Sequence, residues 1–305
     1  MPPSRTYSDP DTIAQIADLT LRSRRLAEGG ISGQHRSPFH GFNIEFASYR
    51  EYTPGDDLRR LDWRVFARSD RHYIKQYEEE SNARVTFVVD ASASMNYRGS
   101  KAALSKFDYG ATLVVTLAML LARQQDPVGL VLFDEDAGTV LAPSATQSQV
   151  TVMSGLLEGC VPARKTELGG MLRSLAGRIR RRGLLVIVSD LFTDLEAVYD
   201  SLNRLRFQGH EVLVLQVLDR DEIELPFDGP TLFRDIEGDE ELYAEPGAFR
   251  LAYRRAMDEF LDGVSKECGA RGYDHVRFFT DTPLSVSLSS FLHARQEAGG
   301  TGGRG

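Results

Sequence analysis

The chain has 305 residues, of which 42% are hydrophobic and 26% charged, a composition typical of a folded protein and not of a disordered one. No apolar run reaches the ~18 residues needed to span a bilayer, and the first residues lack the apolar core of a secretory signal. Cys160 and Cys268 lie too far apart to indicate a disulfide framework or a metal-ligand pair. Together these features predict a cytoplasmic protein.

The net charge of −8 is unevenly distributed along the chain. Between Asp219 and Glu245 there are eleven acidic residues against two arginines, so this stretch holds −9 and the remainder is nearly neutral. An acidic surface disfavours nonspecific binding to nucleic acid. The stretch fits two interpretations: a solvated acidic face, or a docking site for a basic partner.

The part of the chain before Arg84 divides into two pieces. Apolar positions at helical spacing predict a helix in an N-terminal segment, residues 1–29. In residues 30–84, glycine and proline separate short aromatic-rich runs, which predicts a β-rich subdomain of extended segments and turns. Its extended segments are expected at Phe42–Tyr49, Trp63–Arg68 and His72–Tyr77.

From Val85 onward, strand and helix patterns alternate, which predicts a doubly wound, mostly parallel α/β sheet over residues 85–295 with an acidic insertion at 219–246. The expected strands are Val85–Val89, Val128–Phe133, Thr139–Leu141, Leu184–Ser189, Glu211–Val217 and His275–Phe279. The expected helices are Phe107–Gln124, Gln147–Leu157, Leu168–Arg182, Leu195–Phe207, Ala248–Cys268 and Leu284–Arg295. The glycine-rich end, residues 296–305, is expected to be a flexible tail.

Asp90, Ser92 and Ser94 follow the first buried strand directly. In doubly wound sheets, ligands bind beyond the carboxyl ends of the strands, where the strand order reverses. Hydroxyl and carboxylate oxygens are hard ligands that suit Mg²⁺ or Mn²⁺, and no neighbouring histidine or cysteine indicates zinc. Taken alone, the pattern is also explained by a turn or a helix cap.

Two further segments offer oxygen ligands. Asp190 ends the apolar strand Leu184–Ser189, and Thr166 precedes the helix that begins at Leu168. Either residue has a simpler explanation, because Asp190 would serve as the N-cap of the next helix and Thr166 as the N-cap of the Leu168 helix.

These three segments resemble the metal-ion-dependent adhesion site of von Willebrand factor A domains, which has Asp-x-Ser-x-Ser, a threonine before x-x-Gly, and a strand-ending aspartate. The resemblance implies that Ser92, Ser94 and Thr166 supply hydroxyl oxygens to Mg²⁺ or Mn²⁺. Asp90 and Asp190 would then bind the metal directly or through water. Leu191 departs from the pattern, because that family commonly has glycine after the aspartate.

A second resemblance lies upstream of the first strand of the sheet. The stretch EFASYREYTPGDDLRRLDW at residues 45–63 resembles the signature of DUF58 proteins, as do PFDGP at 226–230 and TDTPL at 280–284. The likeness covers about residues 15–295. The signature serves either to lock the β-rich subdomain onto the sheet or to bind a partner. In the second case the contact residues would be Arg50, Tyr52, Asp56, Asp57, Trp63 and Arg68.

Three functions follow from these features. The favoured one is a non-enzymatic, metal-dependent interaction module that binds an acidic side chain of a partner. The DUF58 resemblance implies a bacterial adaptor that works with a MoxR-type AAA+ ATPase in protein assembly or maturation. The alternatives are a scaffold with an empty metal site that binds through residues 30–84, and a metal-dependent hydrolase. The hydrolase is disfavoured because Ser92 stands where an aspartyl phosphatase needs a second aspartate, and no histidine lies beside it.

Overall fold

The computed structural model describes residues 44–51, 73–79, 84–133, 138–162, 167–179, 181–236, 238 and 240–301. Within the predicted β-rich subdomain, β1 (Ile44–Glu51) pairs antiparallel with β2 (Tyr73–Glu79). The predicted N-terminal helix lies outside the described residues. The predicted site residues Tyr52, Asp56, Asp57, Trp63, Arg68 and Thr166 also lie outside them.

The central sheet contains all six strands expected after residue 84. They are β3 (Val85–Asp90), β4 (Val128–Phe133), β5 (Thr139–Ser144), β6 (Leu184–Ser189), β7 (Glu211–Leu218) and β10 (Asp274–Phe279). Their order is β10-β7-β6-β3-β4-β5, and every neighbouring pair is parallel except β4 with β5. The predicted α/β fold with a mostly parallel sheet is therefore confirmed.

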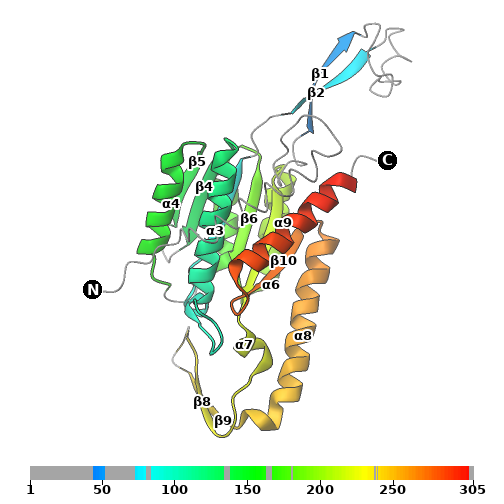
Figure 1. Cartoon of the computed structure of the whole chain (residues 1–305). Coiled ribbons are helices and arrows are strands. Elements are labelled where there is room, and N and C mark those ends of the chain that lie inside the picture. The colour runs from blue at the N-terminus through cyan, green and yellow to red at the C-terminus, as the bar shows by residue number, and fades with distance from the viewer. Residues whose placement is uncertain are drawn as a thin grey trace.

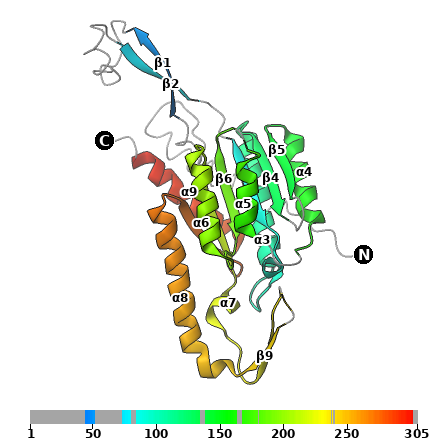
Figure 2. The same cartoon turned by 180° about the vertical axis from the view of Figure 1, so that it is seen from behind.

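Helices cover both faces of this sheet, as the two opposite views show (Figures 1 and 2). One face holds α3 (Lys106–Arg123), α4 (Gln147–Gly159) and α9 (Leu284–Thr301). The other holds α5 (Leu168–Ala176), α6 (Leu195–Phe207) and α8 (Pro246–Ala270). Among the described residues, no helix has the length and apolar character that crossing a bilayer requires.

The central strand β3 shows why the sheet has two cores. Its side chains alternate between the two faces, as the pleat of any strand requires. Phe87 and Val89 lie in the core that contains α3, whereas Val88 lies in the core that contains α6. Because both faces are covered, the strand is apolar almost throughout and is buried at every position.

Two helix ends differ from the prediction. Helix α5 stops at Ala176 and not at Arg182, because Gly177 forms its C-cap and glycine is a poor helix former. Helix α9 runs to Thr301, past the predicted end at Arg295, and so occupies part of the expected flexible tail. Extending an existing helix adds a hydrogen bond per residue, so an established helix can continue even through residues of low helix propensity such as Gly299 and Gly300.

The acidic stretch forms elements of its own beyond the carboxyl ends of the parallel strands. A short helix, α7 (Arg220–Glu224), follows β7, and an antiparallel hairpin follows from β8 (Thr231–Arg234) and β9 (Glu241–Ala244). In both views this hairpin lies at the end of the molecule opposite β1 and β2 (Figures 1 and 2).

The strand order also locates the point where the chain reverses direction across the sheet. From β3 the chain proceeds to β4 and β5 on one side, then crosses to β6 on the other side. Strands β3 and β6 are hydrogen-bonded neighbours, so their carboxyl ends lie together at this reversal. That is the position at which open α/β sheets bind ligands.

Candidate functional site

The turn after β3 brings Asp90, Ser92 and Ser94 together, as their spacing predicted. Asp90 Oδ1 accepts a hydrogen bond of 2.9 Å from the main-chain nitrogen of Ser92. The hydroxyl oxygens of Ser92 and Ser94 are 3.0 Å apart. Ser94 lies in a short 3₁₀ helix, Ala93–Asn96, whose turn places the two hydroxyls side by side.

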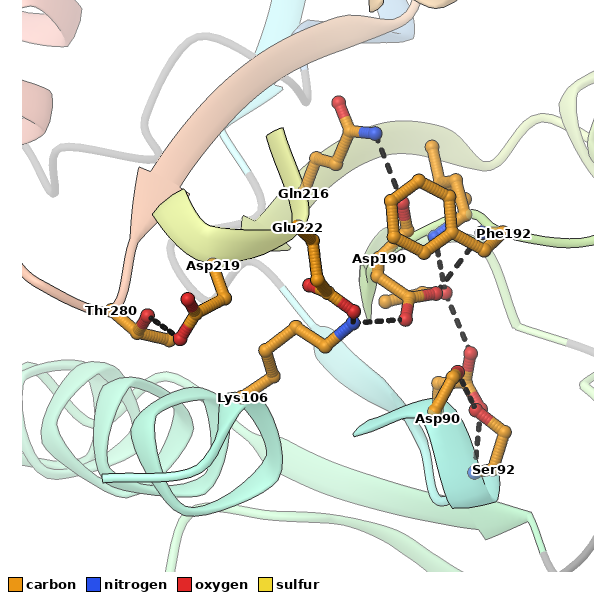
Figure 3. Close-up of polar contacts among 12 residues, drawn as sticks. Asp90, Ser92, Lys106, Asp190, Phe192, Gln216, Asp219, Glu222 and Thr280 are labelled. Atoms are coloured by element: carbon orange, nitrogen blue, oxygen red, sulfur yellow. Dashed lines mark hydrogen bonds and ion pairs between the residues drawn. The ribbon is translucent and has the colours of Figure 1, made fainter. Parts of the chain in front are cut away.

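Ser189 links this turn to the neighbouring strand. Its hydroxyl donates to Asp90 Oδ2 at 2.6 Å and accepts from the main-chain nitrogen of Leu191 at 3.0 Å. Ser189 is the last residue of β6, so this hydrogen bond joins the ends of β3 and β6. Asp190 is the next residue, and it therefore lies at the same edge as Asp90 (Figure 3).

Asp190 is buried, and its own main chain and side chain are both fixed. Its Oδ1 accepts from the main-chain nitrogen of Phe192 at 3.0 Å, and its main-chain oxygen accepts from Gln216 Nε2 at 3.0 Å. The alternative role as a helix cap is wrong, because Asp194 is the N-cap of α6 and accepts from the nitrogen of Glu196.

Leu191, the residue after Asp190, has a backbone conformation that usually requires glycine. Its φ of 63° is in the left-handed region that glycine adopts without cost. In a residue with a Cβ this conformation costs about 1–2 kcal/mol. The Leu191 side chain is buried in the core with α6, so apolar burial offsets the backbone strain.

Lys106 is the main feature of the site that the sequence analysis missed. It is the first residue of α3 and is fully buried, with 0% of its surface exposed. Its Nζ lies 2.7 Å from Asp190 Oδ2 and 2.6 Å from Glu222 Oε1 (Figure 3). The available signal was a lysine that opens an otherwise apolar helix, since a buried lysine requires carboxylate partners.

The ammonium group lies in a fully buried enclosure that includes two aromatic rings. Its Nζ lies 5.0 Å from the centroid of the Phe192 ring and 5.9 Å from that of Tyr97. Ring faces attract a desolvated cation. The enclosure also keeps water from the ion pairs, which strengthens their electrostatic interaction.

Burial and neighbouring charges shift the ionisation of these groups. Desolvation, together with the charge of Asp190, raises the pKa of Asp90 to about 6. Desolvation raises the pKa of Glu222 to about 7, although Lys106 opposes the shift. Burial alone would lower the pKa of Lys106, but the carboxylates of Asp190 and Glu222 outweigh it and the pKa is raised. The ammonium is therefore charged at neutral pH.

Asp219, the residue after β7, is a third buried carboxylate at this edge, and it holds three loop segments together by hydrogen bonds. It accepts hydrogen bonds from the nitrogen of Gly99 at 2.9 Å, the hydroxyl of Thr280 at 2.7 Å and the nitrogen of Asp221 at 3.0 Å. In the sequence, Asp219 stood out only as a member of the acidic stretch. Its position directly after an apolar strand, like that of Asp190, was the missed signal.

The donor set at the edge of the sheet fits a hard divalent cation in its chemistry. Two adjacent hydroxyls and two buried carboxylates provide only oxygen, the ligand atom that Mg²⁺ and Mn²⁺ prefer. Among the described residues, no three His, Cys, Asp or Glu side chains group as a metal site would need, so a metal here depends on Ser92 and Ser94. Asp190 is shared with the ammonium of Lys106.

Several known proteins are similar to this chain. A protein of Mycobacterium bovis and one of Mycobacterium tuberculosis, both described as uncharacterized, are each 27% identical over 293 residues, which is 94% of this chain and 91% of theirs. Among solved structures, BatB from Bacteroides thetaiotaomicron is 16% identical with a TM-score of 0.45, and covers 71% of this chain and 100% of its own. An aerotolerance-related membrane protein from Bacteroides fragilis is 17% identical with a TM-score of 0.46 and the same coverage.

The family comparison covers most of the chain. The model of a family described as a protein of unknown function, DUF58, matches residues 48–260. This span includes most of the stretch at 45–63, the Asp90 turn, Asp190 and the acidic segment. The chain therefore belongs to the DUF58 family.

Proposed function

We propose that this protein is a non-enzymatic interaction module that holds Mg²⁺ or Mn²⁺ at the ends of β3 and β6 and uses it to bind a carboxylate of a partner. The observation that supports this most directly is the 3.0 Å separation of the Ser92 and Ser94 hydroxyls beside buried Asp90, at the reversal point of the sheet. Thr166 is the third hydroxyl that the likeness to von Willebrand factor A domains assigns to the metal.

The chemistry of the donors favours ligand binding over catalysis. Neutral hydroxyls leave a divalent cation with much of its positive charge, so an Asp or Glu side chain from another protein can complete its coordination. Asp90 and Asp190 would hold the metal from the protein side. Hydrolysis would need a free base next to the metal. Lys106, which contacts Asp190, is charged at neutral pH, and the Glu222 carboxylate is already paired with that ammonium.

The family resemblance points to a MoxR-type AAA+ ATPase, or a client that presents an acidic residue, as the partner. The protein would then serve as an adaptor in assembly or maturation. Residues 30–84 offer a second contact region, and Arg50 lies in β1. The proposed metal site lies at the carboxyl ends of β3 and β6, and the elements beyond the carboxyl ends of the sheet lie at the opposite end of the molecule from β1 and β2 (Figure 1). Such an adaptor could therefore contact two proteins at once.

The test is capture of a purified MoxR-type ATPase by the full-length chain with Mg²⁺ or with EDTA. Capture should be lost in EDTA and in the double variant Ser92→Ala/Ser94→Ala. The control is Ser148→Ala/Ser154→Ala, which removes two hydroxyls whose hydrogen bonds are solvent-exposed on α4. Capture that survives EDTA but is lost in Trp63→Ala would contradict the metal-dependent function and favour the scaffold that binds through residues 30–84.

A further inference from the structure

Lys106 already neutralises the Asp190 carboxylate, which the proposed metal needs as a negatively charged ligand. Its ammonium is 2.7 Å from Asp190 Oδ2 and 2.6 Å from Glu222 Oε1, and the exposed fractions of the three side chains are 0%, 2% and 17%. Two cations that share one buried carboxylate repel each other strongly, because little water screens them. Metal binding at Asp190 and the Lys106–Asp190 ion pair therefore oppose each other.

We propose that Lys106 is an internal counter-cation that competes with the divalent metal for Asp190. This inference rests on the proposed function, because it assigns the regulation of the same metal site. In one state the ammonium bridges Asp190 and Glu222, and Asp190 is neutralised without a metal. In the other state the metal takes Asp190, and the ammonium keeps Glu222 alone.

Glu222 makes the second state accessible. A buried ammonium left without a carboxylate would be strongly destabilising, but the 2.6 Å contact with Glu222 remains when Asp190 is given up. The main chain of Glu222 is itself held, since its oxygen accepts from the Tyr253 hydroxyl at 2.5 Å. Glu222 lies in α7, so the exchange of cations at Asp190 reaches the element that leads into the hairpin β8–β9.

The decisive variant is Lys106→Met/Glu222→Gln in the full-length chain. It removes both members of the Lys106–Glu222 ion pair, so Asp190 is released and no buried carboxylate at position 222 is left without its partner. Because the ammonium then neither occupies Asp190 nor repels the metal, Mn²⁺ should bind about tenfold more tightly or better. Free Mn²⁺ measured by electron paramagnetic resonance during a titration gives the dissociation constant.

The matched control is Arg220→Met/Asp281→Asn. It also removes one ion pair, with 3.4 Å between Arg220 Nε and Asp281 Oδ2, and Arg220 begins the same helix α7. Neither residue contacts Asp190 in any hydrogen bond or ion pair of the described residues. Its Mn²⁺ affinity should remain within about twofold of the unaltered chain, since surface ion pairs contribute little.

A further set of variants tests whether the gain in Mn²⁺ affinity depends on Asp190. In an Asp190→Asn background, the substitutions at Lys106 and Glu222 should no longer tighten Mn²⁺ binding. If the double variant does not fold, Lys106→Gln alone replaces it, because the glutamine amide can still donate hydrogen bonds to the two carboxylates. This single variant should also bind Mn²⁺ more tightly than the unaltered chain. Circular dichroism establishes which variants are folded.

The outcomes separate this inference from the proposed function. If the unaltered chain binds Mn²⁺ and the Lys106 variants bind it with equal or lower affinity, the competition alone is overturned. A gain in Mn²⁺ affinity that persists in the Asp190→Asn background also overturns the competition alone. Binding only in the Lys106 variants supports the competition and contradicts metal dependence of the natural chain. Absence of binding in every folded variant overturns both.

Discussion

Gln216 and His275 are joined by a hydrogen bond of 3.0 Å between Oε1 and Nε2. The amide nitrogen of the same glutamine donates to the main-chain oxygen of Asp190, so Oε1 must face the histidine and the proton must be on Nε2. Nδ1 then accepts from the Ser265 hydroxyl at 3.1 Å. A neutral histidine of one defined tautomer therefore supports the strand end that holds Asp190.

The neutral state of His275 predicts a loss of stability in mild acid. Burial, with the charge of Arg277, lowers the pKa of His275 to about 4 from an ordinary 6.5. A lowered folded-state pKa gives stability that is present above pH 6.5 and is lost as the pH falls towards 4. The free energy of unfolding, measured with urea at pH 7, 6 and 5, should fall more steeply with decreasing pH for the natural chain than for His275→Gln. Parallel pH profiles for the two proteins would contradict this assignment.

Glu211, the first residue of β7, predicts a pH effect of the opposite sign. Burial and the nearby charge of Asp274 raise its pKa to about 7 from 4.5, despite Arg295 and Arg206. A raised folded-state pKa gives stability that is present below pH 4.5 and is lost as the pH rises through 7. Glu211→Gln should therefore be more stable than the natural chain in urea unfolding at pH 8, with a difference that disappears at pH 4.5. A variant that is less stable at pH 8 would show that the carboxylate is favourably paired.

The sequence was sufficient to predict the sheet and part of the site because those features are local. The β6 strand appears in the sequence as a continuous apolar run, and Asp190 follows it directly. Likewise, Asp90, Ser92 and Ser94 are separated by two positions each, so one turn brings them together. A strand end and a turn are both determined by neighbours in the chain.

The ion pairs of Lys106 could not be predicted in the same way. Its partners are 84 and 116 positions away, at Asp190 and Glu222. The contact depends on α3, β6 and α7 meeting at one edge, which is a consequence of the strand order and leaves no spacing pattern in the sequence. Glu222 was also not distinguishable from its acidic neighbours, because the sequence alone does not show which acidic residues of the stretch are buried.

Leu191 predicts an unusual order of stability between two small substitutions. Ala keeps the backbone strain at φ 63° while losing the buried leucine side chain, whereas Gly loses the side chain but adopts that φ freely. Leu191→Gly should therefore be more stable than Leu191→Ala by about 1 kcal/mol, although both are less stable than the natural chain. Chemical unfolding of the two variants gives the comparison. The usual order, with Ala above Gly, would mean that the backbone at this position relaxes.

Gly99 predicts that one added methyl group disrupts the edge of the site. A Cβ at this position would lie 2.0 Å from Oδ1 of Asp219, and the main-chain nitrogen of Gly99 donates to the same carboxylate. Asp219 cannot withdraw without breaking its hydrogen bond to Thr280, so the clash should cost about 1–3 kcal/mol in Gly99→Ala.

The control for Gly99→Ala is Gly155→Ala, on the exposed side of α4, where an added Cβ meets nothing within 4 Å. That substitution should stabilise the protein by about 0.5–1 kcal/mol, because alanine is the better helix former. The free energy of unfolding measured with urea should therefore be lower than that of the natural chain for Gly99→Ala and higher for Gly155→Ala. Equal stability of Gly99→Ala and the natural chain would mean that the loop at Gly99 moves away from Asp219, and that Asp219 does not fix this edge of the sheet.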